Sequence, residues 1–340
     1  MVDIINTIVC PIIRQDHVLP MLRSLKQNTP ANFRTIVINQ TQPNREFEAA
    51  LYEEADYIIR GHYNLGFAQS VNLGIRLAST PYVCACNDDV IFINDAWWNG
   101  VIETFERFET AAAVNPQSPK EPGWGWGEPG YRYKIPKAFM TEELQKLHDA
   151  DRAAMQVLKA AKQALEETQR LGAQDWELQV RRKELEAAGS AFQNLQRQLE
   201  ARTFEFSKNL EYIKSLVEEA NWAVVDAFAC WCTVFKAEVL EKIGLFDERF
   251  FPGGGEDYCW QHRCYKLGYR ALSSSRSWVW HWWGQSKDHP RGFDTALPNA
   301  RAHWNKLSTK GFGKEGLYDP DCGVWGEGER TDPVIYRAPL

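Results

Sequence analysis

The sequence has no apolar run long enough to cross a lipid bilayer. Its longest run, from Trp222 to Phe235, is shorter than the roughly 20 residues that a membrane helix needs, and it contains Asp226. The opening residues also lack the basic region, the apolar stretch and the small-residue cleavage site of a secretory signal. These absences predict a cytoplasmic protein without a transmembrane segment, and they leave peripheral contact with a membrane open.

The sequence also lacks an excess of positive charge. Its 340 residues include 39 Lys and Arg against 45 Asp and Glu, which gives a formal net charge of −6. A nucleic-acid groove needs clustered Lys and Arg to neutralise phosphates. The charge balance therefore argues against a nucleic-acid partner.

The eight cysteines lack the CxxC spacing of structural zinc sites. Cys84 with Cys86, and Cys230 with Cys232, instead form CxC pairs inside apolar runs. Because alternate residues of a strand share a face, each pair is predicted to lie on one side of a buried strand. A reduced thiol packs there as a small apolar group, so we expect buried free cysteines in preference to a metal site.

The sequence does contain short apolar runs that alternate with helical patterns. Residues 4–13, 35–38, 57–59 and 82–86 have the length and composition of buried strands. Segments with helical spacing of apolar residues separate them. This alternation predicts an α/β fold with a mostly parallel sheet covered by helices.

The composition changes between residues 141 and 220. Proline is absent there, and Glu, Lys, Gln, Arg, Ala and Leu dominate. Apolar residues recur at a 3-4 spacing on two arms, which predicts a long antiparallel coiled-coil hairpin. Gly172 is expected to end the first arm, and Asp175 to cap the second.

Two interpretations of this hairpin stay open. It is either a solvated spacer with a thin core of its own, or a surface for association with a second copy or another partner. A two-helix hairpin buries little apolar surface alone, which favours association. Its charges are mixed in sign and evenly spread, as on exposed helix faces, so no catalytic residue is expected within it.

Two acidic clusters lie about 170 residues apart. Asn87-Asp88-Asp89 follows the run 82–86, and Glu256-Asp257 follows the glycines Gly253–Gly255. Carboxylates at the carboxyl end of a buried strand lie where open α/β sheets bind ligands. Divalent ions that hold phosphates use one or two such carboxylates. Together the clusters predict a metal-held phosphate substrate and a separate base, which is the chemistry of sugar transfer from a nucleotide.

Five segments of the chain follow one another in a recognisable order. They are Ile8-Val9-Cys10-Pro11, Asn64-Leu65-Gly66-Phe67-Ala68 with Asn72-Leu73-Gly74-Ile75, Asn87-Asp88-Asp89, Gly244-Leu245-Phe246-Asp247-Glu248-Arg249-Phe250-Phe251 with Glu256-Asp257, and His281. In these segments the chain resembles glycosyltransferase family 2 enzymes and, more broadly, nucleotide-sugar transferases of the GT-A fold. The resemblance covers residues 4–135 and 222–310, with the hairpin inserted between them.

The resemblance and the composition together divide the chain into four segments. Residues 1–140 are expected to bind the nucleotide sugar, and residues 141–220 to form the inserted hairpin. Residues 221–318 are expected to bind the acceptor and carry the catalytic base. Residues 319–340, which are rich in Gly, Pro and Asp, are expected to form an irregular tail.

The resemblance implies a set of contacts with the nucleotide-sugar donor. Family members usually hold the base with an Asp after the second strand, whereas this chain has Asn39 there. An amide can both donate and accept hydrogen bonds, so we expect base recognition with an altered preference. The implied donor contacts are Pro11, Asn39, Asn64, Gly66, Asn72 and Asp88.

The resemblance also implies a divalent ion, Mn²⁺ or Mg²⁺. Asp89, supported by Asp88, is its expected ligand, because Asn87 occupies the first position of the family's DxD motif. An ion bridging the diphosphate would neutralise the leaving group. His281 lies where many members carry a metal-binding histidine. The alternatives are a solvated turn for the acidic run and simple packing for His281.

Asp257 and Glu256 are the expected catalytic residues. Asp257 would take the proton from the acceptor hydroxyl as general base. Glu256 would cap the helix that follows, and capping by both carboxylates is the alternative.

Tryptophan is unusually frequent, with 14 copies. Trp124 and Trp126 lie in a glycine-rich loop, and Trp282 and Trp283 follow His281 directly. An indole ring offers an apolar face to sugar C–H groups and one N–H donor, so these four are the expected acceptor and sugar contacts. Packing in a core or against the hairpin is the alternative.

The sequence therefore predicts an inverting, metal-dependent glycosyltransferase that moves one hexosyl-type sugar. The donor would be a UDP-, GDP- or dTDP-sugar, and the acceptor a glycan or another hydroxyl compound. The QxxRW signature of processive members is absent, and a retaining outcome stays open. Two rivals remain: a silent GT-A-like module that oligomerises through its coiled coil, and a nucleotidyltransferase, which the missing glycine-rich basic phosphate loop disfavours.

Overall fold

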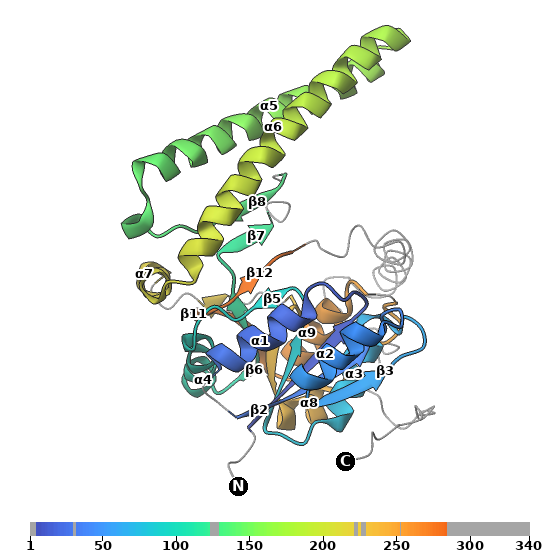
Figure 1. Cartoon of the computed structure of the whole chain (residues 1–340), viewed down its shortest axis with the longest axis vertical. Helices are drawn as coiled ribbons and strands as arrows, with labels where there is room; N and C mark the ends of the chain where they lie inside the picture. The colour runs from blue at the N-terminus through green and yellow to red at the C-terminus, as the bar shows by residue number, and fades with distance from the viewer. Residues whose placement is uncertain are drawn as a thin grey trace. The chain divides into compact units, whose positions relative to one another are not determined.

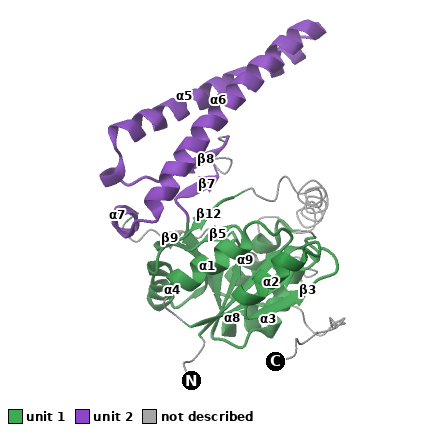
Figure 2. Cartoon of the chain, viewed as in Figure 1, with its two compact units in different colours: residues 1–117, 220–340 green, residues 118–219 purple. Residues whose placement is uncertain are grey.

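The computed structural model describes residues 5–29, 32–122, 129–220, 224–225, 229–251 and 253–283 (Figure 1). The chain divides into two compact units, Met1–Gln117 with Ala220–Leu340, and Ser118–Glu219 (Figure 2). The predicted sugar contacts Trp124 and Trp126 and the predicted tail 319–340 lie outside the described residues. Among the helices described, none combines the length and the hydropathy that a membrane span requires.

The first unit is built on an eight-stranded sheet with the order β3-β2-β1-β4-β10-β6-β11-β9. β10 runs antiparallel to both of its neighbours and β9 to its one neighbour, and the other adjacent strands are parallel. This confirms the predicted α/β fold with a mostly parallel sheet. The strands are β1 (Asn6–Ile12), β2 (Phe33–Asn39), β3 (Tyr57–Arg60), β4 (Tyr82–Cys86), β6 (Ala111–Gln117), β9 (Val224–Val225), β10 (Cys232–Lys236) and β11 (Arg270–Trp278).

Helices cover both faces of this sheet, and each face has its own apolar core. Residues of α1, α2 and α4 pack in one core, and residues of α3, α8 and α9 in the other. In β1, Ile8 and Cys10 belong to the first core and Val9 to the second, because neighbouring side chains of a strand point to opposite faces. The central residues of β1 are therefore apolar on both faces. The helices are α1 (Val18–Asn28), α2 (Arg45–Glu54), α3 (Gly66–Leu77), α4 (Ala96–Arg107), α8 (Ala237–Ile243) and α9 (Glu256–Lys266).

The cysteines of the described residues are buried, as predicted, and none of them forms a disulfide bond. Cys84 and Cys86 share one face of β4 and pack in the first core. The second CxC pair is different: Cys232 lies in the first core and Cys230 in the second. The prediction that both members share a face was wrong for this pair, because β10 begins only at Cys232.

The second unit contains the predicted hairpin as two long helices, α5 (Glu142–Arg170) and α6 (Asp175–Ser207), which pack against each other. Gly172, with φ +70°, lies in the turn between them. The predicted cap at Asp175 was wrong by one position: Gln174 precedes α6, and its N–H donates to the Glu177 carboxylate at 3.0 Å. The second arm is also interrupted before a separate helix, α7 (Leu210–Ala220).

A short ribbon joins this unit upstream of residue 141. It consists of β7 (Lys120–Pro122) and β8 (Tyr131–Tyr133), which pair antiparallel and precede the 3-10 turn η2 (Lys137–Phe139). Gly130 lies directly before β8 with φ +76°, and a Cβ there would approach the Phe192 ring of α6 to 2.7 Å. The ribbon therefore packs closely on α6, which explains why the compact unit begins at Ser118.

Candidate active site

The loops after β1, β2 and β4 leave one edge of the sheet at the place where the strand order reverses. β1 lies between β2 and β4, and all of these strands are parallel. Ligands of open α/β sheets bind at such a switch point, outside the carboxyl ends of the strands. Asp88 and Asp89 follow β4 directly, so the first acidic cluster is at this edge.

His281 reaches the first acidic cluster through a small ribbon. β5 (Val90–Ile91) pairs antiparallel with β12 (Trp280–His281), which puts His281 opposite Val90. The Trp282 N–H donates to the Asp89 backbone oxygen at 3.0 Å. In the same place His281 Nε2 lies 3.0 Å from Asp89 Oδ1, and both side chains are buried. The structure therefore joins two predicted metal ligands that are 192 positions apart.

His281 is also packed between tryptophan rings. Its imidazole stacks on Trp231, with ring centroids 4.6 Å apart and planes inclined by 13°. The ring centroids of Trp283 and the His281 imidazole are 4.1 Å apart. The Trp283 backbone has φ +55°. Trp282 contacts Trp280 edge-on at 5.5 Å. The packing expected as the alternative for His281 is therefore present, together with a contact to Asp89, the other predicted metal ligand.

The loop after β1 brings Arg14 and His17 near this edge. Burial lowers the pKa of His17, the nearby Arg14 charge lowers it further, and the Asp89 charge opposes both. Burial raises the pKa of Asp88 to about 7, the Asp89 charge adds to this, and Arg14 opposes it. Burial would also raise the pKa of Asp89, but the His281 charge and hydrogen bond bring it below the ordinary value.

The donor set at this edge fits a hard divalent ion held jointly with a substrate. A carboxylate oxygen and an imidazole nitrogen 3.0 Å apart suit Mn²⁺, and such ions complete their shell with water and phosphate oxygens. In the described ranges, no group of three or more His, Cys, Asp and Glu side chains is arranged to hold a metal. The arrangement therefore does not suit a structural metal with a full set of protein ligands.

The second acidic cluster begins α9 and comes to the same edge. The glycines Gly253–Gly255 before it have φ values of 156°, 101° and 108°. Glu256, only 6% exposed, accepts a hydrogen bond from the Gly254 N–H. Asp257 is half-buried, and its Oδ1 accepts from the Tyr258 N–H at 2.8 Å. Glu256, the first residue of α9, thus holds the glycine loop, and Asp257 follows it in the first turn of the helix.

The link between the two clusters is the segment before β10. The backbone N–H of Cys230 faces the Asp257 carboxylate. The next residue, Trp231, accepts a hydrogen bond from the Asn87 N–H at 2.8 Å and stacks on His281. A segment of two residues therefore touches both ends of the predicted site.

Burial is the main influence on both carboxyl groups of the second cluster. It raises the pKa of Glu256 to about 8, and the neighbouring Asp257 charge adds to the effect. Burial also raises the pKa of Asp257, although the backbone N–H groups of Tyr258 and Cys230 oppose the shift. A carboxylate with a raised pKa is a stronger base than an ordinary aspartate, as proton abstraction near neutral pH requires.

One residue predicted to contact the nucleotide-sugar donor, Asn72, instead makes its hydrogen bonds within the protein. Asn72 donates to the Phe246 oxygen and to Glu248 Oε1, both at 2.8 Å, and its own oxygen accepts from the Phe246 N–H at 3.0 Å. Both amide hydrogens are therefore occupied, which argues against the predicted donor contact. Asn72 instead joins α3 to the segment that leads to α9.

The remaining predicted donor contacts lie near the carboxyl edge. Asn64 Oδ1 accepts from the Gly66 N–H at 2.9 Å, and Gly66, with φ +76°, begins α3. Pro11 is half-buried in β1 opposite Ile38 of β2. Asn39 is the last residue of β2 and is only 1% exposed.

Sequence reasoning missed Arg14, His17 and Trp231. Arg14 and His17 follow the first predicted strand closely, as Asp88 and Asp89 follow the run 82–86. The rule that singled out the acidic pair would therefore have found them. Trp231 carries no comparable signal, because its importance depends on His281, far away in the chain.

Comparison with known proteins gives one family and several solved structures. Residues 7–165 match the family model described as glycosyl transferase family 2. No curated protein matches the chain.

The solved structures are distant in sequence. The mannosyltransferase PcManGT from Pyrobaculum calidifontis, in complex with GDP-Man and Mn²⁺, is 12% identical with a TM-score of 0.44, over 90% of this chain and 75% of that chain. GalNAc-T7 with UDP, GalNAc and Mn²⁺ is 11% identical with a TM-score of 0.46, over 89% of this chain and 54% of that chain. The chain therefore spans only about half of the second protein.

Proposed function

We propose that this chain, which belongs to glycosyl transferase family 2 over residues 7–165, transfers a single sugar from a nucleotide-diphosphate donor to a hydroxyl acceptor. The transfer would depend on a divalent ion and invert the anomeric configuration. The observation that carries the proposal is that the two-residue segment Cys230–Trp231 contacts Asp257 through its Cys230 N–H and stacks Trp231 on the His281 that is paired with Asp89.

Asp89 and His281 would hold the ion. Their ribbon is anchored by the Trp282 N–H on the Asp89 backbone, and the imidazole is fixed between Trp231 and Trp283. Such fixed side chains suit a site that must meet a diphosphate at a defined position. When bound, Mn²⁺ or Mg²⁺ would neutralise the charge that develops on the leaving diphosphate.

Arg14 and His17 would support the diphosphate from the loop after β1. The Arg14 charge lowers the pKa of Asp88 and of Asp89, and the His17 charge lowers that of Asp89. The Arg14 guanidinium would supply positive charge, and His17, whose pKa is lowered, would donate a hydrogen bond as a neutral imidazole. Asp88 would lie between these groups and the ion.

Asp257 would act as the general base. Its raised pKa equips it to take the proton of the acceptor hydroxyl as the oxygen attacks the anomeric carbon. Glu256 would have a different task, since its carboxyl group is engaged with the Gly254 N–H. By holding the glycine loop, it would position Asp257 and leave room for the acceptor.

The chemistry of the two solved enzymes is consistent with this proposal. The mannosyltransferase complex contains GDP-Man and Mn²⁺, and the GalNAc-T7 complex contains UDP, GalNAc and Mn²⁺. A metal-dependent nucleotide-sugar reaction is proposed for this chain on its own Asp89–His281 pair, because the likeness to those structures is low.

The deciding experiment is a panel of nucleotide diphosphates and their sugars, scored by thermal shift with and without Mn²⁺. A ligand that binds only the folded state raises the apparent stability. We expect a Mn²⁺-dependent shift that Asp89→Asn abolishes, and slow donor hydrolysis that Asp257→Asn abolishes while the shift remains. The anomeric configuration of the product then tests inversion.

A second result would redirect the proposal. If the folded protein shows no shift with any nucleotide, and its oligomers depend on the second unit, the silent assembly module becomes the better interpretation. A nucleotide-dependent thermal shift that a chelator does not change would still show nucleotide binding. It would contradict the role of metal ligands given to Asp89 and His281.

A further inference from the structure

We propose that Asn115 is a positioning residue for the transfer, because its side chain fixes the turn formed by residues 229–231 (the 229–231 turn), which serves both ends of the site. This inference rests on the proposed function, since the turn contacts the residues proposed as general base and metal ligand. Asn115 would act through the turn and would not itself touch the ion or the acceptor.

The 229–231 turn is tight and lies directly before β10. The Trp231 N–H donates to the Ala229 backbone oxygen at 2.8 Å, which is the hydrogen bond of a γ-turn. The central residue, Cys230, directs its N–H to the Asp257 carboxylate. The Trp231 ring stacks on His281. A small rotation of this turn would therefore displace a donor from the proposed base and a ring from the proposed metal ligand.

The paired backbone of the sheet reaches the 229–231 turn from the β4 side. There the Asn87 N–H donates to the Trp231 oxygen at 2.8 Å. On the opposite side of β10, the backbone pairing with β6 ends at Val234 and Val114. The turn lies beyond this last pair, so β6 can hold it only through a side chain.

Asn115 supplies that side chain. It follows Val114 in β6 and is only 2% exposed. Its amide nitrogen donates to the Ala229 backbone oxygen, and its Oδ1 accepts from the Thr233 hydroxyl at 2.5 Å. A carbonyl oxygen can only accept, so the amide nitrogen must face Ala229 and the amide oxygen must face Thr233. One buried side chain therefore holds the chain on both sides of Cys230–Cys232.

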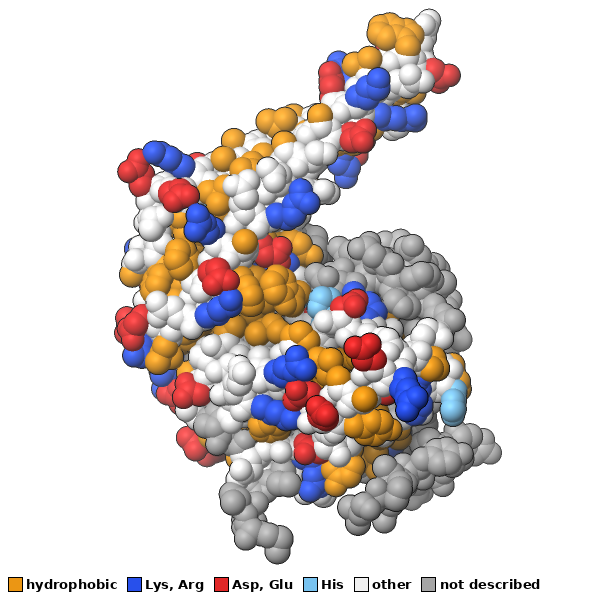
Figure 3. All heavy atoms as spheres, viewed as in Figure 1, with side chains coloured by type: hydrophobic (Ala, Val, Ile, Leu, Met, Phe, Trp, Pro, Cys, Tyr) orange, Lys and Arg blue, Asp and Glu red, His pale blue; other side chains and the backbone are white. Residues whose placement is uncertain are grey.

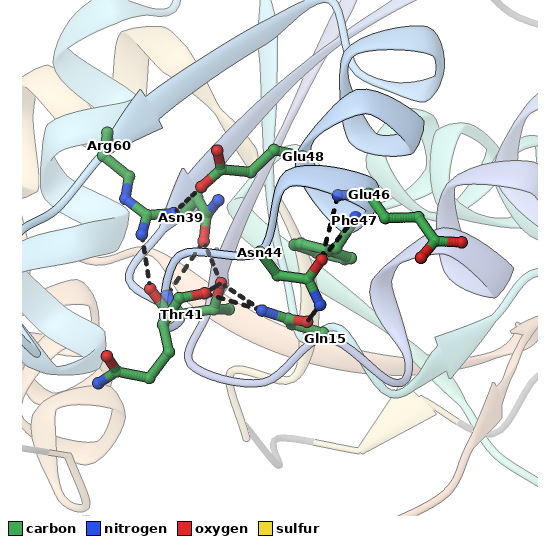
Figure 4. Close-up of polar contacts among 9 residues, drawn as sticks. Gln15, Asn39, Thr41, Asn44, Glu46, Phe47, Glu48 and Arg60 are labelled. Atoms are coloured by element: carbon green, nitrogen blue, oxygen red, sulfur yellow. Dashed lines mark hydrogen bonds and ion pairs between the residues drawn. The ribbon is translucent and has the colours of Figure 1, made fainter.

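A strand-end asparagine holds a segment of this chain in one other place. Asn39 is the last residue of β2, and its Oδ1 accepts from the Thr41 N–H at 3.0 Å and from the Thr41 hydroxyl at 2.9 Å (Figure 4). In both places an amide side chain continues the hold of a strand on residues beyond its paired backbone. The segment held by Asn115 is the one that contacts the proposed base and the proposed metal ligand.

The expected size of the effect follows from this position behind two functional contacts. Side chains that orient metal ligands from behind usually contribute about 10–100-fold to metal affinity or activity. Asn115→Leu is similar in size but makes no hydrogen bond. We expect it to lower both kcat and the affinity of the nucleotide complex for Mn²⁺ by about 10–100-fold.

Thr233→Val is a milder variant with a matched control. It removes a hydroxyl from a fully buried side chain and should lower kcat and Mn²⁺ affinity by about tenfold, whereas Thr233→Ser keeps the hydroxyl and should preserve both. Thr104→Val is the control. Thr104 is equally buried in the first unit, and its hydroxyl shares a hydrogen bond with Ser274 at 2.7 Å. This control should lose stability and keep both quantities.

The measurement uses the full chain with UDP, GDP or dTDP, whichever binds most tightly. Calorimetric titration of Mn²⁺ into that nucleotide complex gives the metal affinity, and hydrolysis of the matching sugar nucleotide gives kcat and KM. Thermal unfolding is measured on every variant, and both assays are run well below the lowest Tm. A purely structural role would lower the Tm of Thr233→Val and Thr104→Val alike and leave kcat and Mn²⁺ affinity at their natural values.

The outcomes separate this inference from the proposed function. If Asn115→Leu and Thr233→Val leave kcat and Mn²⁺ affinity unchanged, or if Thr104→Val lowers them as much, the positioning role is overturned and the proposed function stands. If the natural protein shows neither Mn²⁺-dependent nucleotide binding nor turnover, the proposed function fails and this inference fails with it.

Discussion

The two compact units bury polar groups in different ways. In the second unit they are matched: Asp151 accepts from Gln196 at 2.7 Å, and the buried Lys120 forms an ion pair with Glu200. In the first unit like charges are adjacent, in Asp88–Asp89 and Glu256–Asp257, and burial raises the pKa of three of these four groups. Such pairs cost stability and cluster at functional sites.

The units also differ in how far apart their partners lie in the sequence. Charged side chains of both signs are interspersed along the long helices of the second unit (Figure 3), and many pair three or four positions apart, as Glu142 does with Lys146. The first unit joins Asp89 to His281 across 192 positions. The candidate site therefore depends on a distant contact, whereas the exposed charge pairs along the helices of the second unit are local.

The largest expected effect concerns the base at the start of α9. Asp257→Asn should lower turnover by about 10²–10⁴-fold, the usual contribution of a general base. Mn²⁺-dependent nucleotide binding should persist, because Asp257 is not among the proposed ligands of the ion. Steady-state kinetics and calorimetry on the same preparation check both halves, with the exposed Asp149→Asn as control. Unchanged turnover would remove Asp257 from the mechanism.

A core substitution in α6 should affect only the second unit. Phe192 is buried beneath Gly130, so Phe192→Ala should lower the free energy of unfolding of this unit by about 3–5 kcal/mol. Denaturant unfolding followed by circular dichroism measures the change, and the exposed Leu171→Ala should have little effect. Nucleotide binding should be unaltered. If nucleotide binding by Phe192→Ala falls together with its helix content, the two units are more strongly coupled than proposed.

The raised pKa of Glu256 predicts a pH-dependent stability. Glu256 binds its proton more tightly in the folded than in the unfolded chain, so its contribution to stability is complete below about pH 4.3 and is lost as the pH rises through about 8. Glu256→Gln cannot ionise and keeps an oxygen for the Gly254 N–H.

Glu256→Gln should therefore be more stable than the natural protein at pH 9 and little different at pH 4. Thermal unfolding at the two pH values measures this. A difference of the same size at both would show that packing, and not ionisation, is responsible.

The smallest effect is expected at an exposed ion pair of α5. Lys146 Nζ lies 2.6 Å from Glu142 Oε1, with both side chains largely in solvent. Lys146→Ala should change the free energy of unfolding by no more than about 0.5 kcal/mol. Denaturant unfolding at low and high salt tests this. A larger loss would mean that the helical unit also relies on specific charge pairs.

Several features could be predicted because they depend on neighbouring residues. Apolar runs of strand length indicated β1, β2, β3 and β4, and the proline-free segment 141–220 indicated α5 and α6. The predictions that failed concern precise positions. Gln174, and not Asp175, precedes α6, and Cys230 and Cys232 face different cores. A shift of one residue at an element's end is enough to change such an assignment.

The sequence by itself determined the alternation of strands and helices, the long helical pair and the two acidic clusters at strand and helix ends. These follow from composition and spacing within a few residues. Only the tertiary structure decided that His281 meets Asp89 and that the Asn72 amide is occupied by Phe246 and Glu248. The reason is physical: a side chain's partner across a sheet depends on which strands become neighbours, and that choice is made by burial of the whole core.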